Sequence, residues 1–317
     1  MRFNKTIALC LATVLVLLTA VGCNKAIKET EHKTLVTLVL DKGGVNDGSF
    51  NESAWLGAQE AAKELDVEVK YLESTTDADY ESNIETAIDM KSDLIIAIGF
   101  NLSDAIEKAS QGYPNQQFAI VDGSFEKIPS NVTPIVFNES EAGFLAGVAT
   151  AKAIKSDKYG FIGGYELPAV LNYKSGFEQG LTAVNPNATL STQYANSFSD
   201  AAKGRAIAEQ MYSSGVECIM AAAGGVNNGV YEVGAERNKY AVAVDLAQSN
   251  VSPDVIVTSA IKNVNIGVFN TIKQLIEDNL QGGKEMTYSI ANDGVGYEKT
   301  HFLTKETVEF VESIKNK

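Results

Sequence analysis

Short apolar runs alternate with amphipathic helical patterns along most of the chain, and this alternation constrains the fold more than any other feature. The runs that we predict to be strands are 35–40, 67–72, 94–98, 118–121, 135–137, 159–162, 190–194, 218–223, 240–244 and 255–259. The predicted helices between them include 53–65, 78–90, 103–111, 141–155, 170–184, 201–214 and 264–279. Regular βαβα alternation implies parallel sheets covered by helices on both faces. So many strands predict an α/β protein with two sheets.

A weak internal repeat supports two related lobes. Residues 35–65 and 159–184 both read as a strand, a glycine-containing loop, an aromatic residue and a helix. Duplicated sheets that face each other across a cleft are expected in a two-lobed binding protein. The alternative is that any two βα units look alike, and the repeat alone does not decide between these interpretations.

The N-terminus has the features of an export signal. Arg2 and Lys5 precede an apolar run that ends at Val21, and the run is short for a membrane span. Ala20-Val-Gly-Cys23 is similar to a lipobox, with Ala20 where leucine is commonest. We therefore predict a signal peptide at 1–22, lipidation of Cys23, and a lipidated polar tether at 23–33. Plain secretion is the alternative.

Composition excludes several classes of function. The net charge of −14 argues against nucleic acid, which requires clustered Lys and Arg. Arginine occurs only at positions 2, 205 and 237, so an anionic ligand is not expected. The histidines, His32 and His301, lie near the chain ends, so a Ser-His-Asp triad lacks a base. We predict no enzyme, no cofactor and no metal site, although a glycosidase-type carboxylate pair is conceivable.

The polar, glycine-rich stretch 41–55 is the first candidate for a binding site. It joins a buried strand to a helix, and ligands of open α/β sheets bind at the carboxyl ends of strands. Its side chains offer hydrogen-bonding groups at Asn46, Asp47 and Asn51 and a flat apolar ring at Phe50. The stretch has neither a P-loop lysine nor the dinucleotide glycine spacing. An ordinary glycine-rich turn is the alternative interpretation.

This stretch resembles the signature of the basic membrane protein family of substrate-binding lipoproteins. The polar loop, Phe50 and Trp55 fall in the same register as in that family, and the resemblance extends from about Leu35 onward. The best-understood members bind purine nucleosides for ABC importers. The resemblance implies a two-lobed type I periplasmic-binding-protein fold, with a ligand cleft between lobes that the chain crosses three times.

The resemblance also implies where the chain passes between lobes. We expect crossings near Asn138, Ser259 and Lys284. The expected division is 34–138 plus 260–284 for lobe one and 139–259 plus 285–317 for lobe two.

Further ligand contacts follow at the ends of later strands. Asp122 ends the strand at 118–121, so we expect its carboxylate to face the cleft and accept hydrogen bonds from two vicinal ribose hydroxyls. The resemblance gives Asp245 as a contact to base or sugar, and Lys262 as a contact to a ribose oxygen. Carboxylates and amides suit a neutral, polyhydroxylated ligand because they accept and donate hydrogen bonds. The alternatives are an Asp-Gly turn for Asp122 and a solvated lysine for Lys262. After Asp245 the sequence departs from the family, so its neighbours are not assigned.

Two loops complete the predicted site. We expect the backbone of Gly225, in the loop 223–229, to pack against the ligand. Phe198 is expected to stack on a base opposite Phe50, although a core position for Phe198 is the alternative. Asp200 is expected to cap the following helix. The predicted ligand-binding residues are Asn46, Asp47, Phe50, Asn51, Asp122, Phe198, Gly225, Asp245 and Lys262.

We therefore expect a lipid-anchored receptor on the extracytoplasmic face of the cell membrane. It would capture a nucleoside, with a purine expected, close by a hinge motion and deliver the ligand to an ABC permease. One alternative is a sugar receptor of the same fold, and another is a surface interaction lipoprotein. The pair Phe50 and Phe198 favours a base over a sugar.

Overall fold

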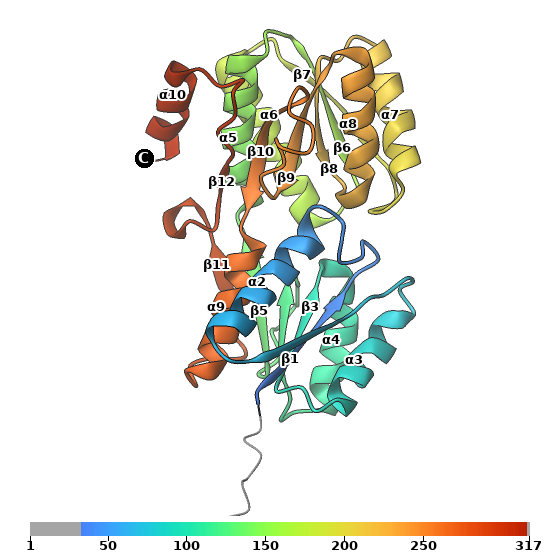
Figure 1. Cartoon of the computed structure of the whole chain (residues 1–317), viewed down its shortest axis with the longest axis vertical. Coiled ribbons are helices and arrows are strands. Elements are labelled where there is room, and N and C mark those ends of the chain that lie inside the picture. Colours follow the sequence, from blue (N-terminus) through green and yellow to red (C-terminus); the bar gives the residue numbers. More distant parts are fainter. Residues whose placement is uncertain (1–32, 316–317) are drawn as a thin grey trace, which may run out of the picture. The chain divides into compact units, whose positions relative to one another are not determined.

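The computed structural model describes residues 33–315. The predicted signal peptide, the predicted lipidation site Cys23 and the predicted tether up to residue 32 lie outside this range. Within it the strands form two six-stranded sheets with helices packed around them, which confirms the predicted α/β fold (Figure 1). None of the helices in this part of the chain is long and apolar enough to cross a membrane.

The first sheet has the strand order β11-β5-β4-β3-β1-β2, and every neighbouring pair is parallel. β1 and β3 are buried along their whole length, which explains why their sequences are apolar except for Thr37 in β1. The strands are β1 (Leu35–Leu40), β2 (Glu68–Leu72), β3 (Leu94–Ile98), β4 (Gln117–Val121), β5 (Val132–Phe137) and β11 (Met286–Tyr288). The accompanying helices are α2 (Phe50–Glu64), α3 (Asp79–Asp89), α4 (Ser103–Gly112) and α9 (Val264–Ile276).

The second sheet has the order β12-β10-β9-β8-β6-β7, and only β12 runs antiparallel to its neighbour among the described pairs. Its strands are β6 (Lys158–Gly163), β7 (Thr189–Tyr194), β8 (Cys218–Ala222), β9 (Tyr240–Asp245), β10 (Ile256–Lys262) and β12 (Val295–Tyr297). Its helices are α5 (Glu139–Ala153), α6 (Pro168–Val184), α7 (Ala201–Ser213), α8 (Asn227–Arg237) and α10 (Lys305–Lys315). The Asp200 side chain accepts a hydrogen bond from the Lys203 amide, which confirms the predicted cap of α7.

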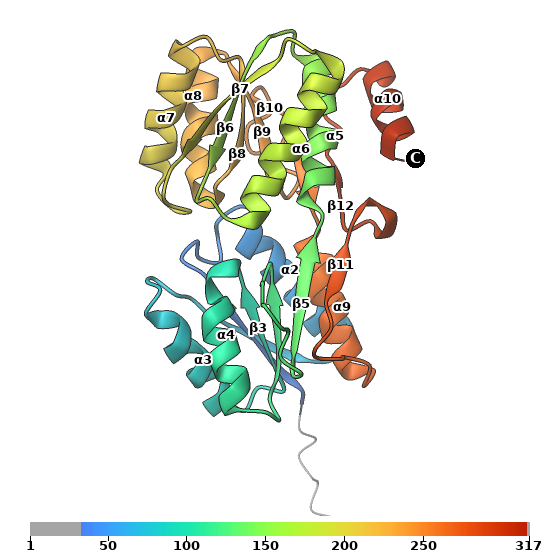
Figure 2. The same cartoon turned by 180° about the vertical axis from the view of Figure 1, so that it is seen from behind.

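The chain passes between the sheets at the ends of β5, β10 and β11 (Figure 2). β10 stays in the second sheet up to Lys262, which pairs with Val295 of β12, so the crossing expected near Ser259 comes too early. The crossing expected near Lys284 is also too early, because β11 pairs with β5 in the first sheet up to Tyr288. These strand ends depend on long-range pairing rather than on a local apolar pattern. We call 34–138 with 263–288 lobe one, and 139–262 with 289–315 lobe two.

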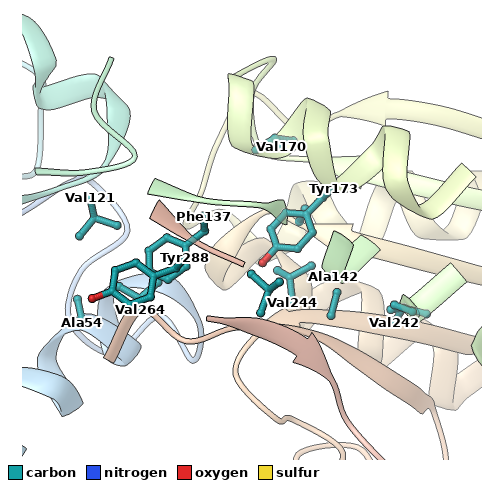
Figure 3. Close-up of a cluster of buried hydrophobic side chains, with 14 of the residues drawn as sticks. Ala54, Val121, Phe137, Ala142, Val170, Tyr173, Val242, Val244, Val264 and Tyr288 are labelled. Carbon is teal, nitrogen blue, oxygen red and sulfur yellow. The ribbon is translucent and has the colours of Figure 1, made fainter. Parts of the chain in front are cut away.

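Two aromatic rings stack where the chain leaves β5 and β11 to pass between the lobes. Phe137 ends β5 and Tyr288 ends β11, and their rings stack with centroids 5.1 Å apart and planes 22° apart (Figure 3). The backbone amide of Asn138 donates to the carbonyl oxygen of Tyr288 over 2.8 Å. The first and third crossings, which both lead from lobe one to lobe two, are therefore held side by side.

Glycines let α5 and α6 pack in direct backbone contact. A Cβ atom on Gly176 would lie 2.1 Å from the carbonyl oxygen of Ser140, and one on Gly143 would lie 2.5 Å from that of Tyr173. Larger residues would force the helices apart. This close approach places Tyr173 over the carboxyl ends of the second sheet, with its hydroxyl pointing away from α6 (Figure 3).

Candidate ligand-binding site

A cavity lies between the lobes at the carboxyl ends of both parallel sheets. It holds about 650 Å³ of space free of protein atoms, part of it open to solvent. The cavity is lined by the predicted residues Asp47, Phe50, Asn51, Asp122, Phe198, Asp245 and Lys262. Other lining residues are Asp41, Gly43, Gly99, Phe100, Asn101, Leu167, Ala169, Val170, Tyr173, Ala222, Ala223, Gly224 and Val244. Parallel strands bring their carboxyl ends to one edge, so residues far apart in sequence meet here.

The Asp47 carboxylate builds the loop and begins α2. It accepts hydrogen bonds from the backbone amides of Ser49, Asn51 and Glu52, at 2.9, 3.0 and 3.1 Å. The amides of Asn51 and Glu52 belong to the first turn of α2, whose donors have no partner within the helix. Burial raises the pKa of Asp47 to about 7. Asn46 is exposed, and it is not among the described residues that line the cavity.

Asn51 and Asp41 form a polar wall on the lobe-one side. The Asn51 amide nitrogen donates to Asp41 Oδ1 over 2.8 Å, and the same oxygen accepts from the Gly43 amide at 2.9 Å. Asn51 Oδ1 is buried and has no donor within the described chain. Burial raises the pKa of Asp41 above its ordinary value. Asp41 is not among the predicted ligand-binding residues, although it follows β1 just as Asp122 follows β4.

Lys262 is held by two carboxylates at the base of the cavity. Its Nζ donates to Asp122 Oδ2 over 2.5 Å and to Glu139 Oε1 over 2.8 Å, and its side chain is only 1% exposed. Burial alone would lower the pKa of Lys262, but the two carboxylates raise it above its ordinary value. Burial also raises the pKa of Asp122 to about 7, although Lys262 opposes this shift. Glu139 was missed because no motif marks a helix-starting acid as a partner of Lys262.

Hydroxyl donors from both lobes hold Asp245 at the end of β9. Ser49 Oγ, from the loop before α2, donates to Asp245 Oδ2. Tyr173, from α6, donates to Asp245 Oδ1 over 3.1 Å. Burial raises the pKa of Asp245, while Lys262 and these hydroxyls lower it. Serine and tyrosine are common residues, so nothing in the sequence distinguished Ser49 and Tyr173 as partners of Asp245.

Aromatic rings supply the apolar part of the wall. Phe50 lies in lobe one with its ring centroid 5.1 Å from Lys262 Nζ. Phe198 lies in lobe two, edge-on to Tyr165 at 5.2 Å between centroids. The backbone amide of Gly225 donates a hydrogen bond to the carbonyl oxygen of Phe198 over 2.8 Å. This amide therefore already has a partner within the protein. Gly224 lines the cavity in lobe two, whereas Gly225 lies outside the lining that the described residues form.

The side chains around the cavity suit a ligand rich in hydrogen-bond donors. The lining includes the carboxylate groups of Asp41, Asp122 and Asp245. Among the described residues that line the cavity, Lys262 is the basic one. Excess negative charge at low effective dielectric disfavours an anionic ligand. The described residues include no group of three or more His, Cys, Asp or Glu able to hold a metal ion.

Comparisons with known proteins show the family to which the chain belongs. Residues 34–317 match the family described as ABC transporter substrate-binding protein PnrA-like (Bmp). The chain is 38% identical over 304 residues to the CD4+ T-cell-stimulating antigen of Listeria monocytogenes, covering 89% of this chain and 85% of the relative. It is 36% identical over 279 residues to the ABC transporter nucleoside-binding protein BmpA of Lactococcus lactis, covering 81% and 79% of the two chains.

A solved structure shows the same architecture. The crystal structure of an ABC transporter solute-binding protein from Aeropyrum pernix K1 superposes with a TM-score of 0.81 at 26% identity, over 89% of this chain and 90% of that one. The predicted type I periplasmic-binding-protein fold is therefore confirmed. Proteins of the matched family are substrate-binding proteins rather than enzymes. The chain belongs to the PnrA-like (Bmp) family of ABC transporter substrate-binding proteins.

Proposed function

We propose that this substrate-binding protein captures a nucleoside, with a purine base, and delivers it to an ABC permease. The observation that carries the proposal is a cavity that combines aromatic rings with buried carboxylates. A nucleoside has a flat base for the rings and donor hydroxyls for the carboxylates. The relative from Lactococcus lactis named as a nucleoside-binding protein supports the same ligand class.

The proposed pose places the base between Phe50 and Phe198, which line the cavity from opposite lobes. An aromatic ring on each side favours a planar heterocycle over a sugar ring. The ribose hydroxyls would donate to Asp122 and Asp245. Lys262 would use its remaining N–H, since an ammonium has three donors and the structure uses two.

The proposed cellular setting follows from the N-terminal sequence. Cleavage before Cys23 and lipidation of its thiol would anchor the protein to the extracytoplasmic face of the membrane. The lobes would act as the two domains that close by hinge motion around the ligand before docking on the permease. The crossing segments beside Phe137 and Tyr288 would carry that hinge.

Calorimetry with a ligand panel tests the proposal. Inosine, guanosine and adenosine are expected to bind, and free ribose is expected to bind much more weakly because it cannot occupy the aromatic wall. Ribose or glucose binding as tightly as inosine would instead identify a sugar receptor. Failure of every nucleoside and sugar to bind would favour a surface interaction protein.

Inosine 5′-monophosphate is the matched control for charge. A phosphate about 4 Å from one carboxylate experiences a repulsion of ~4 kcal/mol at an effective dielectric of ~20. We therefore expect the nucleotide to bind far more weakly than inosine. Equal affinity for the two would contradict the electrostatic argument.

A further inference from the structure

Ser49 occupies a helix N-cap but does not act as one. A serine at this position usually accepts a hydrogen bond from an amide in the first helical turn. Within the described chain the Ser49 side chain makes no such bond, and the Asp47 carboxylate accepts from the amides of Asn51 and Glu52 instead. The Ser49 hydroxyl is thereby free to donate to Asp245.

The bond from Ser49 to Asp245 joins the two lobes. Ser49 precedes α2 in lobe one, and Asp245 ends β9 in lobe two. Both residues are buried, at 1% and 6% exposure. Neither residue belongs to a crossing segment, so the hydrogen bond requires the lobes to meet. The contact between Lys262 and Asp122 differs, because Lys262 lies at the crossing itself.

Tyr173 provides the comparison within one lobe. It donates to the second Asp245 oxygen from α6, which belongs to lobe two, so separation of the lobes leaves this bond intact. A carboxylate has about four lone-pair sites, and these hydroxyls occupy two of them. Asp245 therefore keeps acceptor sites for a ligand in the cavity that it lines.

We propose that Ser49 is a positioning residue for ligand retention, whose hydroxyl holds Asp245 from the opposite lobe only when the lobes are closed. Ligand capture at Asp245 and closure of the lobes are thereby coupled through one hydrogen bond. This inference rests on the proposed function in one respect, namely that closure accompanies binding. Loss of the Ser49 hydroxyl shortens ligand residence without slowing ligand entry.

The test compares Ser49→Ala with Ser53→Ala in the full chain. Ser53 lies one turn later on α2, is also buried, and its hydroxyl accepts from the Asn265 amide within lobe one. Stopped-flow binding of inosine is expected to show a dissociation rate about tenfold higher in Ser49→Ala, with an association rate within about twofold of wild type. Ser53→Ala should leave both rates near wild type, and Ser49→Thr, which keeps the hydroxyl, should restore slow dissociation.

Amide hydrogen exchange in lobe two separates the proposed role from a local defect at the start of α2, because such a defect would leave exchange in the other lobe unchanged. Segment 222–228 lies in lobe two and lines the cavity near Gly224. We expect faster exchange of this segment in Ser49→Ala than in Ser53→Ala. Unchanged exchange together with an unchanged dissociation rate would overturn the proposal, as would a change confined to the association rate. If wild type fails to bind inosine, the nucleoside proposal fails, and exchange without ligand alone decides the role of Ser49.

Discussion

Replacement of Lys262 by methionine should strongly destabilise the protein. Lys262 Nζ lies 2.5 Å from Asp122 Oδ2 and 2.8 Å from Glu139 Oε1, and the three side chains are 1%, 12% and 3% exposed. At an effective dielectric of ~20 each attraction is worth ~6–7 kcal/mol before desolvation is subtracted. Methionine keeps most of the side-chain volume, so the change removes the charge and leaves two carboxylates facing each other.

The net magnitude follows from the carboxylates that remain. Removing one partner of a buried ion pair typically costs about 3–5 kcal/mol, because an uncompensated charge stays buried. We expect the free energy of unfolding to fall by that amount at pH 8. Without Lys262 the folded-state pKa of Asp122 rises further above its unfolded value. The folded state then binds more protons than the unfolded state, so acidification to pH 5.5 should recover part of the loss.

Urea unfolding followed by circular dichroism at both pH values measures the effect. Lys108→Met is the control, because its Nζ also lies 2.5 Å from a carboxylate, that of Glu81, but both side chains are more than half exposed. Such exposed pairs contribute about 1 kcal/mol or less. Combining Lys262→Met with Asp122→Asn and Glu139→Gln should restore much of the stability. A loss in Lys262→Met no larger than in Lys108→Met would refute the reasoning.

Three further predictions concern the buried carboxylates, the aromatic wall and the N-terminal cysteine. Burial raises the pKa of Asp47 and Asp122 from 3.8 to about 7, so between those values the folded state is protonated while the unfolded chain is ionised. The unliganded protein should therefore be more stable to urea at pH 5.5 than at pH 8, and a stability that rises with pH would contradict this. Phe50→Ala should weaken inosine binding by about tenfold to a hundredfold in calorimetry, as expected for lost base stacking. Unchanged affinity with a lower melting temperature would place the Phe50 ring in the core. Cys23→Ser should abolish incorporation of labelled fatty acid, and persisting label would show that lipid is attached elsewhere.

The sequence already contains most of the fold. The buried strands β1 and β3 are mostly apolar runs, and each is followed along the chain by a helix. The short strands β11 and β12 carry no such pattern, because three residues are too few for a periodic signal. β11 takes its place by pairing with β5, and the last residues of β10 pair with β12, so the strand ends at the second and third crossings depend on long-range pairing.

The candidate site divides in the same way. Asp122 and Asp245 were recognisable because an acid directly after a buried strand lies at the ligand-binding edge of a parallel sheet. Asp41 fits that rule as well and was overlooked. The roles of Asp47 as a helix cap and of the Gly225 amide as a donor to Phe198 depend on loop geometry, which composition does not reveal.

By itself, the sequence determined which strands and loops can build a cleft, since apolar periodicity and glycine position act locally. Only the tertiary structure decided which groups meet inside that cleft. Lys262 donates a hydrogen bond to Glu139, which is 123 positions away in the sequence. Ser49 donates to Asp245, which is 196 positions away. These pairs form because two separately wound sheets present their strand ends to each other. Burial then makes each hydrogen bond and charge pair electrostatically stronger than it would be in water, since the interior has a much lower dielectric.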